Sequence, residues 1–245
     1  MFVGYPWQQL SSEFFKRREE TMDIRSSQAF WPTFNDFKKS YPSLKTSTST
    51  EVLVIGGGIT GALIAYSLLT AGRTVLLVDR RDVCNGSTAA STAMLQYEID
   101  EPLHSLIDKR GLTCALESYQ QCEKAIATLR DLVQKIDSDC GFADKKSIYF
   151  TRTEKDLEFL RTELKLRRKH GFKVDWSEER DLKQLGLEAV GGIESASGAV
   201  MDPYKFATDL LSYCSNQGLA VFDRTTIRTI TKQEGQLVAV TEDGL

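Results

Sequence analysis

Residues 51–79 read EVLVIGGGITGALIAYSLLTAGRTVLLVD, and this stretch decides the fold. It opens with a short apolar, β-branched run at 52–55, typical of a strand that is buried on both faces of a parallel sheet. Apolar residues then recur at helical spacing from Ile59 to Leu69, and Gly72 supplies a stop signal. A second apolar run at 75–78 follows. The pattern predicts a compact β-α-β unit.

A glycine motif joins the first predicted strand to the helix. Residues 56–61 read GGGITG and match G-x-G-x-x-G. In this setting Gly56 permits a tight turn, Gly58 lets the backbone approach a pyrophosphate, and Gly61 lets helix and strand pack closely. The free N–H groups and the positive end of the helix would then hold a diphosphate. The motif therefore predicts dinucleotide binding.

The second strand ends at an acidic residue, Asp79, which lies 18 residues after Gly61. A carboxylate at this place accepts hydrogen bonds from the ribose hydroxyls of a bound adenosine. Taken alone, Asp79 has an equal alternative as a surface carboxylate paired with Arg80 or Arg81. The β-α-β context favours the nucleotide interpretation.

A segment of small and hydroxyl residues, GSTAASTAML at 86–95, follows the second strand. Such a segment is suited to a short helix whose N-terminus and hydroxyls meet phosphate, with a close backbone approach at Ala93 and Met94. An ordinary capped helix with small packing residues is the alternative. The position of the segment favours a flavin over a nicotinamide cofactor.

At this point the sequence resembles the FAD-dependent D-amino-acid oxidase superfamily, which includes glycine oxidase. The resemblance rests on VIGGGITG at 54–61, LLVDRRD at 76–82, GSTAASTAML at 86–95 and SGAVMDPYKF at 197–206. It implies FAD as the cofactor and assigns residues to its parts. The diphosphate would face Gly56, Gly58, Ile59, Thr60 and Gly61, and the adenosine side would face Asp79 and Arg80. Ser87 and Thr88 would reach phosphate, Ala93, Met94 and Leu95 would pass near the isoalloxazine, and the backbone of Ile227 would meet adenine.

The resemblance also implies the reaction. A hydride equivalent would leave the carbon beside an amine for flavin N5, and the imine would then hydrolyse, so the expected partner is a small amine or amino acid. Gln96, Tyr97 and Glu98 follow the flavin segment and are candidates for lining the site, although ordinary strand or loop roles are favoured. No catalytic residue is nominated. Three alternatives stay open: another flavoprotein class of the hydroxylase or tRNA-modifying type, an NAD-dependent dehydrogenase, and a non-catalytic FAD-binding subunit.

Further elements follow from local patterns. We expect a long amphipathic helix at 111–136, a strand at 147–151, a charged surface helix at 154–170, a helix from Pro203 to about Asn216, a strand at 219–222, and a hairpin that pairs 226–231 with 236–241. The basic end of the 154–170 helix, at 165–169, is interpreted as a solvated face. Tyr204 is expected to be a core or surface aromatic. Asp243-Gly244 is a hairpin signal without a return strand, which suggests a fragment.

The predicted fold class is α/β: a Rossmann-like FAD/NAD(P)-binding domain with a parallel sheet, interrupted by an inserted α+β substrate domain, with the C-terminal part missing. The N-terminal region offers Phe30, Phe34 and Phe37 as apolar anchors of an arm. The predicted organisation is an arm and linker at 1–50, a first FAD-binding segment at 51–97, a helical and substrate-domain segment at 98–200, and an incomplete second FAD-binding segment at 201–245.

Composition narrows the function classes. The net charge of −3 provides no field that attracts a polyanion, so nucleic acid is not expected as a partner. Five scattered cysteines and two histidines make a metal site and a disulfide framework improbable, and most of the thiols should be buried and reduced. No secretory signal opens the chain and no apolar run reaches membrane-spanning length, so a cytoplasmic, soluble protein is expected. Whether the native start is Met1 or Met22 stays open.

Overall fold

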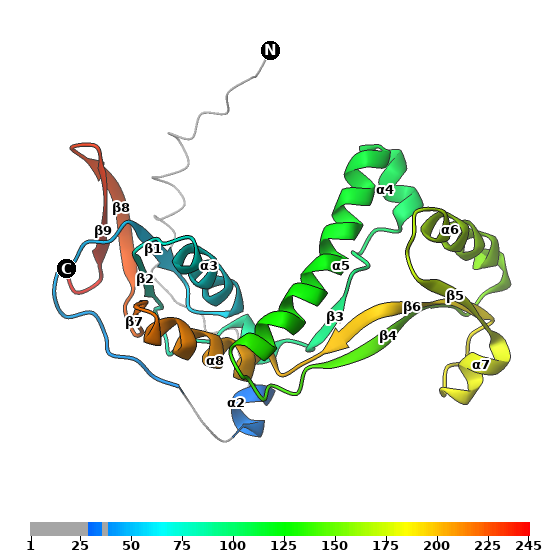
Figure 1. Ribbon diagram of the computed structural model, residues 1–245, viewed down its shortest axis with the longest axis horizontal. Helices are drawn as coiled ribbons and strands as arrows, with labels where there is room; N and C mark the ends of the chain where they lie inside the picture. The colour runs from blue at the N-terminus through cyan, green and yellow to red at the C-terminus, as the bar shows by residue number, and fades with distance from the viewer. Residues whose placement is uncertain (1–28, 36–38) are drawn as a thin grey trace, which may run out of the picture. The chain divides into compact units, whose positions relative to one another are not determined.

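The computed structural model describes residues 29–35 and 39–245, and these form two compact units (Figure 1). The first unit takes in the described residues up to Ser91 together with Pro203–Leu245. The second unit is Thr92–Asp202. The chain therefore leaves the first unit once and returns to it. The predictions about the native start and about Phe37 lie outside the described residues.

The first unit is built on a three-stranded parallel sheet in the order β1-β2-β7. Strand β1 (Val52–Ile55) pairs with β2 (Val75–Val78), which pairs in turn with β7 (Ala220–Phe222). All four residues of β2 are buried, as expected for the central strand of a covered parallel sheet. The predicted parallel sheet is confirmed. Its third strand comes from a segment far along the chain.

Two helices of the first unit pack against each other beside this sheet. Helix α3 (Ile59–Thr70) follows β1, and α8 (Pro203–Asn216) precedes β7, as predicted. The rings of Tyr66 and Tyr213 lie 6.4 Å apart between the two helices. Tyr204 is buried near the start of α8, so it belongs to the core. The predicted hairpin is also present, as β8 (Ile227–Gln233) paired antiparallel with β9 (Gln236–Thr241).

Residues before the first strand are attached to the first unit by side-chain contacts. The short helix α2 (Phe30–Phe34) carries Trp31, whose indole N–H donates to the carbonyl of Ser91 at 2.9 Å. Further along, the amide of Tyr41 donates to the buried carboxylate of Asp223 at 2.7 Å. Phe30 and Phe34 are themselves largely exposed rather than acting as buried anchors.

The second unit is an antiparallel sheet with helices. Strand β6 (Gly191–Val200) is its centre and pairs with β3 (Met94–Gln96), β4 (Ala143–Thr151) and β5 (Val174–Glu178). The helices are α4 (Leu103–Arg110), α5 (Leu112–Lys135), α6 (Leu157–Lys169) and α7 (Glu179–Gln184), with a 3-10 turn η2 at Glu154–Asp156. The rings of Tyr97, Tyr119 and Phe172 meet in the core, and those of Tyr97 and Phe172 stack 5.3 Å apart.

The predicted solvated face at the basic end of α6 is wrong for one of its four cations. Lys165, Arg168 and Lys169 are exposed, but the side chain of Arg167 is only 2% exposed. Helical periodicity at this position turns the guanidinium inward toward two carboxylates, while Arg168 at the next position stays half exposed. Neighbouring cations on one helix thus have opposite environments.

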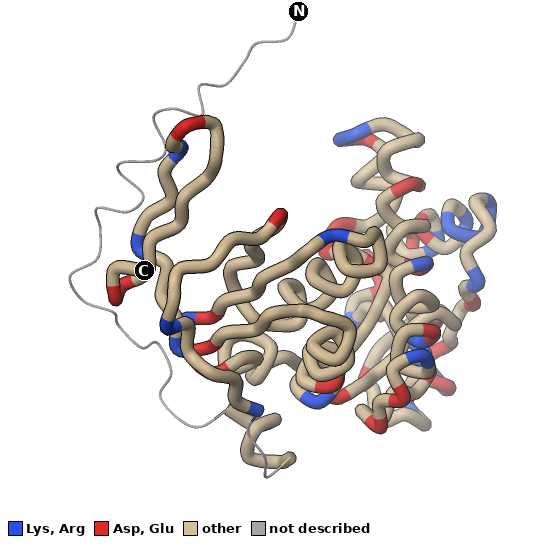
Figure 2. The backbone as a smooth tube through the Cα atoms, turned by 60° about the vertical axis from the view of Figure 1, so that its left-hand side comes forward, with Lys and Arg blue, Asp and Glu red and all other residues tan. Residues whose placement is uncertain are grey.

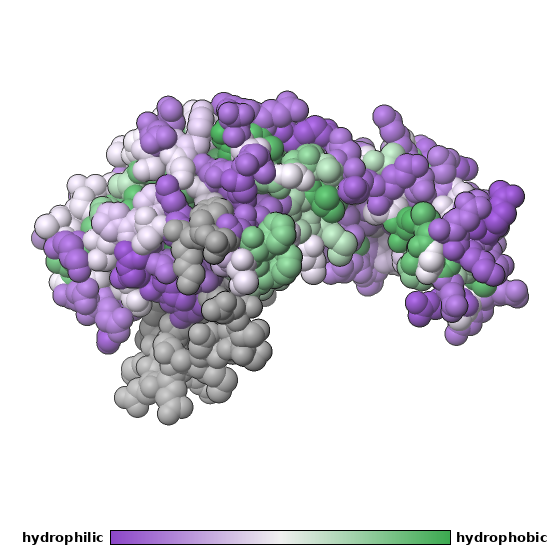
Figure 3. Space-filling view, turned by 90° about the horizontal axis from the view of Figure 1, so that it is seen from below, coloured by the Kyte–Doolittle hydropathy of each residue, from purple (hydrophilic) through white to green (hydrophobic). Residues whose placement is uncertain are grey.

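The surface carries charged side chains of both signs. Acidic and basic residues are interspersed along the part of the chain that the structure describes (Figure 2). The face seen in Figure 3 is mostly hydrophilic, with separate apolar patches. All five cysteines are free, and Cys84, Cys140 and Cys214 are buried, as predicted for most of them. Within 29–35 and 39–245, no helix is both long and apolar enough to cross a membrane.

Candidate functional site

The glycine loop between β1 and α3 is shaped by steric limits at two of its glycines. Gly56 has a φ of +109°, a backbone conformation that side chains disfavour. A Cβ on Gly61 would lie 1.9 Å from the carbonyl oxygen of Gly56, so no larger residue fits there without moving the backbone. The tight turn predicted at Gly56 and the close packing predicted at Gly61 are both present.

The N-terminus of α3 is open to an anion. Gly58 is the N-cap residue and provides no side-chain cap, and the first turn contains no acidic residue. Because the first amides of a helix have no intrahelical acceptor, they need other partners. The amide of Ile59 donates to the hydroxyl of Thr88 at 3.0 Å. The other amides of the first turn, with the positive end of the helix dipole, form the kind of site that binds phosphate.

Thr88 reaches this turn from the small-residue segment. That segment forms a short 3-10 helix, η1 (Ser87–Ala90), in which Thr88 is buried and Ser87 is exposed. A Cβ on Gly58 would lie 3.0 Å from the Thr88 hydroxyl oxygen, so the glycine makes room for this contact. The structure therefore brings Thr88 to the glycine loop, and its predicted contact with phosphate stays a prediction.

Asp79 lies at the same end of the sheet and contacts the loop directly. Its Oδ2 accepts the amide of Gly57 at 2.7 Å, and its Oδ1 accepts the amide of Arg81 at 2.8 Å. The carboxylate thus bonds a backbone amide of Arg81 rather than forming the surface ion pair considered as an alternative. Each carboxylate oxygen has a second lone pair, so capacity remains for ribose hydroxyls.

A buried thiol supports the loop from within the first unit. Cys84 donates its backbone N–H to the carbonyl of Gly57 at 2.9 Å, and its Sγ lies 3.4 Å from the same oxygen. Burial, with a smaller contribution from nearby Asp79, raises the pKa of Cys84 to about 12. The thiol therefore stays neutral and acts as a packing group.

The remaining predicted residues are divided between the units. Arg80 is exposed beside Asp79, and Ile227 is half-buried at the start of β8 in the first unit. Ala93, Met94 and Leu95 belong to the second unit. Ala93 has a φ of +66°, which is uncommon for a residue with a side chain. Met94 is 66% exposed.

These features fit the diphosphate and adenosine parts of FAD. The glycine loop leaves a cradle that side chains would fill, the helix N-terminus is uncapped by any acid, and a carboxylate ends the neighbouring strand. Binding by the individual residues stays a prediction. Within the described part of the chain, no group of His, Cys, Asp or Glu side chains is arranged to hold a metal ion.

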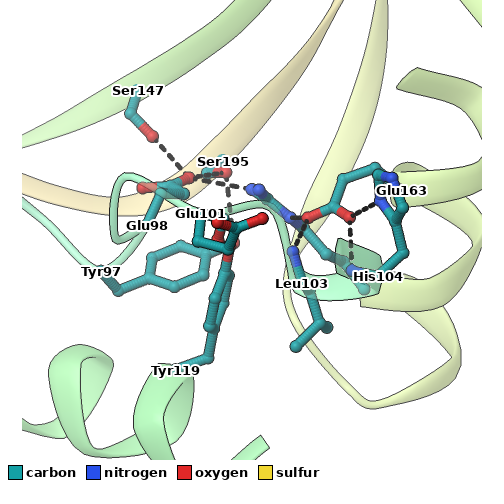
Figure 4. A network of polar contacts seen from close by, with 10 residues as sticks. Tyr97, Glu98, Glu101, Leu103, His104, Tyr119, Ser147, Glu163 and Ser195 are labelled. Atoms are coloured by element: carbon teal, nitrogen blue, oxygen red, sulfur yellow. Dashed lines mark hydrogen bonds and ion pairs between the residues drawn. The ribbon is translucent and has the colours of Figure 1, made fainter. Parts of the chain in front are cut away.

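Sequence reasoning missed a polar network in the second unit (Figure 4). The fully buried carboxylate of Glu163 accepts the amides of Leu103 and His104 at the start of α4, at 2.8 and 3.0 Å. Arg167 donates to Glu163 at 2.6 Å and to Glu98 at 3.3 Å. The spacing of Glu163 and Arg167, four residues apart on one helix, was the available sequence signal.

Comparison with known proteins supports the cofactor assignment. The family model described as FAD dependent oxidoreductase matches residues 51–245. The chain is 28% identical over 210 residues to YhfW of Bacillus subtilis (strain 168), which is named as a Rieske 2Fe-2S iron-sulfur protein, covering 84% of this chain and 40% of that protein. It is 24% identical over 199 residues to one component of the anaerobic glycerol-3-phosphate dehydrogenase of Haemophilus influenzae, covering 80% and 32%.

Among solved structures, the fold resembles L-amino acid deaminase from Proteus vulgaris. The TM-score is 0.67 at 17% sequence identity, covering 84% of this chain and 47% of that one. The chain thus spans less than half the length of each of these proteins. The likeness extends through both units, since most of the described residues are covered.

Proposed function

This chain belongs to the family of FAD-dependent oxidoreductases, and on that premise we propose that the protein oxidises the C–N bond of an amino acid or amine. The observation that carries the redox part is the glycine cradle at the open N-terminus of α3, with Asp79 beside it. Bound there, FAD supplies the acceptor for two electrons and a proton from the substrate.

The chain's own contribution is to bind the cofactor and to orient it. The amides of the glycine loop and the first turn of α3 would hold the diphosphate, with the Thr88 hydroxyl beside them. Asp79 would accept hydrogen bonds from the ribose hydroxyls while it also accepts the hydrogen bond from the Gly57 amide. Gly56 and Gly61 admit no side chain without strain, so the observed loop geometry depends on glycine at both positions.

Two lines of support favour a nitrogen-bearing substrate. The motif at 197–206, SGAVMDPYKF, resembles the D-amino-acid oxidase family, and the fold resembles L-amino acid deaminase. A second candidate is oxidation of a phosphorylated polyol, because a relative at 24% identity is a component of a glycerol-3-phosphate dehydrogenase. The two candidates share the cofactor site and differ in the substrate.

The test is anaerobic titration of the purified full-length protein, followed by its visible absorption spectrum. The panel contains D- and L-amino acids, secondary amines, sn-glycerol 3-phosphate and NAD(P)H. Bleaching of the flavin band by an amino acid or amine is the expected result. Bleaching by glycerol 3-phosphate alone would replace the proposal with the second candidate, and bleaching by NAD(P)H alone would indicate another flavoprotein class. A flavin that no donor reduces would indicate a non-catalytic FAD-binding protein.

A further inference from the structure

Residues 40–44, which read SYPSL, form a strap on the first unit. The strap precedes the range 51–245 that the family model matches, and it contacts the loop that joins β7 to β8. The amide of Tyr41 donates to the carboxylate of Asp223 at 2.7 Å, and the amide of Asp223 donates to the carbonyl of Pro42 at 3.1 Å. The strap and the loop are thus joined by hydrogen bonds in both directions.

The side chain of Arg224, in the same loop, joins the strap to the segment after β2. Its Nη1 donates to the hydroxyl of Ser40 and to the carboxylate of Asp82, both at 2.6 Å. Its Nη2 donates to the carbonyl of Tyr41 and pairs with the buried carboxylate of Asp223 at 2.6 Å. Four contacts in different directions from one side chain depend on the planar, forked geometry of a guanidinium.

The backbone of Arg224 is strained. Its φ is +45°, a left-handed conformation that is uncommon for a residue with a side chain. Backbone strain of this kind persists only where the surrounding structure fixes it, and it is concentrated at functional sites. The contacts of the guanidinium with the strap and with Asp82 provide this restraint.

The same loop contacts Asp79, the carboxylate predicted to meet the ribose. The amide of Thr225 donates to the carbonyl of Asp79 at 2.8 Å, and the amide of Arg224 donates to the carbonyl of Arg81 at 3.2 Å. The hydroxyl of Thr225 also accepts the amide of Leu44 at 3.0 Å, so this residue contacts both the strap and Asp79. A displacement of the loop would therefore move the backbone that carries the Asp79 carboxylate.

We propose that the strap positions the adenosine edge of the FAD site, and that Arg224 is the positioning residue that couples the strap to Asp79. The guanidinium is engaged by the strap, Asp82 and Asp223, so Arg224 acts through Asp79 and not by contact with the cofactor. The proposal rests on the cofactor site described above. The identity of the oxidised substrate does not enter it.

The experiment is a fluorescence titration of the full-length apoprotein with FAD, which gives the dissociation constant. It is made at a temperature at which circular dichroism shows each variant to be folded. The main variant is Arg224→Gly, because glycine adopts a positive φ without strain, so the side chain is removed while the turn is kept. We expect the dissociation constant to rise about tenfold, as for the loss of one hydrogen bond to a charged group. An affinity within about twofold of wild type in the folded variant would overturn the proposal and leave the strap with a purely structural role.

A conservative variant and a matched control locate the effect. Arg224→Lys keeps the positive charge but cannot form the fork, so its dissociation constant should rise about threefold or more. Wild-type affinity in Arg224→Lys would overturn the assignment of Arg224 as a positioning residue. Arg73→Ala removes an exposed arginine that pairs with Glu51 at 3.6 Å before β2, and it should leave the affinity unchanged. An equal loss in Arg73→Ala would refute a specific effect of the strap.

Asp79→Asn tests the cofactor site itself. We expect it to weaken FAD binding at least as much as Arg224→Gly does, because the carboxylate is the group predicted to meet the ribose. Weak binding in Asp79→Asn together with wild-type affinity in Arg224→Gly would refute the strap alone. Absence of FAD binding to the wild-type protein would overturn both the cofactor site and the strap.

Discussion

Gly61→Ala should abolish stable FAD retention, and the structure gives the size of the conflict. The new Cβ would lie 1.9 Å from the carbonyl oxygen of Gly56, whereas real Cβ atoms essentially never approach other atoms within 3.0 Å. The loop and α3 must therefore separate by about 1 Å, which moves the amides that would bind the diphosphate. Alanine is favoured over glycine within a helix by about 1 kcal/mol, and this gain offsets part of the steric cost. The measured loss of stability is therefore smaller than the energy of the clash itself. We expect a net destabilisation of about 1–3 kcal/mol.

Gly57→Ala provides the matched comparison within the same loop. Its Cβ would meet side-chain atoms of Val83 and Leu77 at 3.0 and 3.1 Å, and side chains adjust more easily than backbone does. The assay is the ratio of flavin to protein absorbance after purification, with thermal unfolding of the apoprotein measured separately. Ser67→Ala, on an exposed position of the same helix, controls for substitution in α3 and should change stability by less than about 0.5 kcal/mol. If Gly61→Ala retains FAD and unfolds at the same temperature as Gly57→Ala, the steric argument is wrong.

Three further results are expected. Glu163→Gln should lower the free energy of unfolding in urea by about 2–4 kcal/mol, since it removes the nearer of the two carboxylates that pair with buried Arg167 and leaves only Glu98. A loss below about 1 kcal/mol would count against the buried pair. Burial alone would raise the pKa of Glu163, but Arg167 and the hydrogen bonds from His104 and Leu103 hold the pKa below the usual value of a glutamate. The stability that Glu163 contributes is therefore complete above its unfolded-state pKa and is lost as the pH falls through its folded-state pKa. The difference in free energy of unfolding between wild type and Glu163→Gln should accordingly become smaller in acid. A difference that stays constant as the pH falls would contradict this account. Iodoacetamide at about pH 8 should leave Cys84 unmodified in the folded protein, because its pKa is raised to about 12, while exposed Cys114 reacts; equal labelling in peptide mass spectra would refute the burial of Cys84.

The sequence alone was sufficient for the parts of the first unit that depend on local pattern. The runs at 52–55 and 75–78 are strands, and the helix between them starts at Ile59. These features follow from periodicity and from the conformational freedom of glycine, which act over a few residues. The hairpin of β8 and β9 was predictable for the same reason, since its two strands are joined by a short turn.

The second unit was less accessible to sequence reasoning. Strand β6 has the sequence GGIESASGAV, in which Ile193 and Val200 are the only β-branched residues and no residue is aromatic, so it carries little of the composition that marks strands. It is a strand because it pairs with three others from distant parts of the chain. The inward turn of Arg167 likewise depends on Glu98, which lies 69 residues earlier.

The division follows from the range of the interactions. The β-α-β unit, the glycine loop and the acidic end of β2 are specified by neighbouring residues, so the sequence determined the cofactor class and the residues expected to meet it. Only the tertiary structure decided that β7 completes the parallel sheet, that Thr88 reaches the N-terminus of α3, and that Glu98, Glu163 and Arg167 form one buried network. Such contacts join residues that are far apart in the chain, and their stability comes from burial and complementary charge, which no local periodicity records.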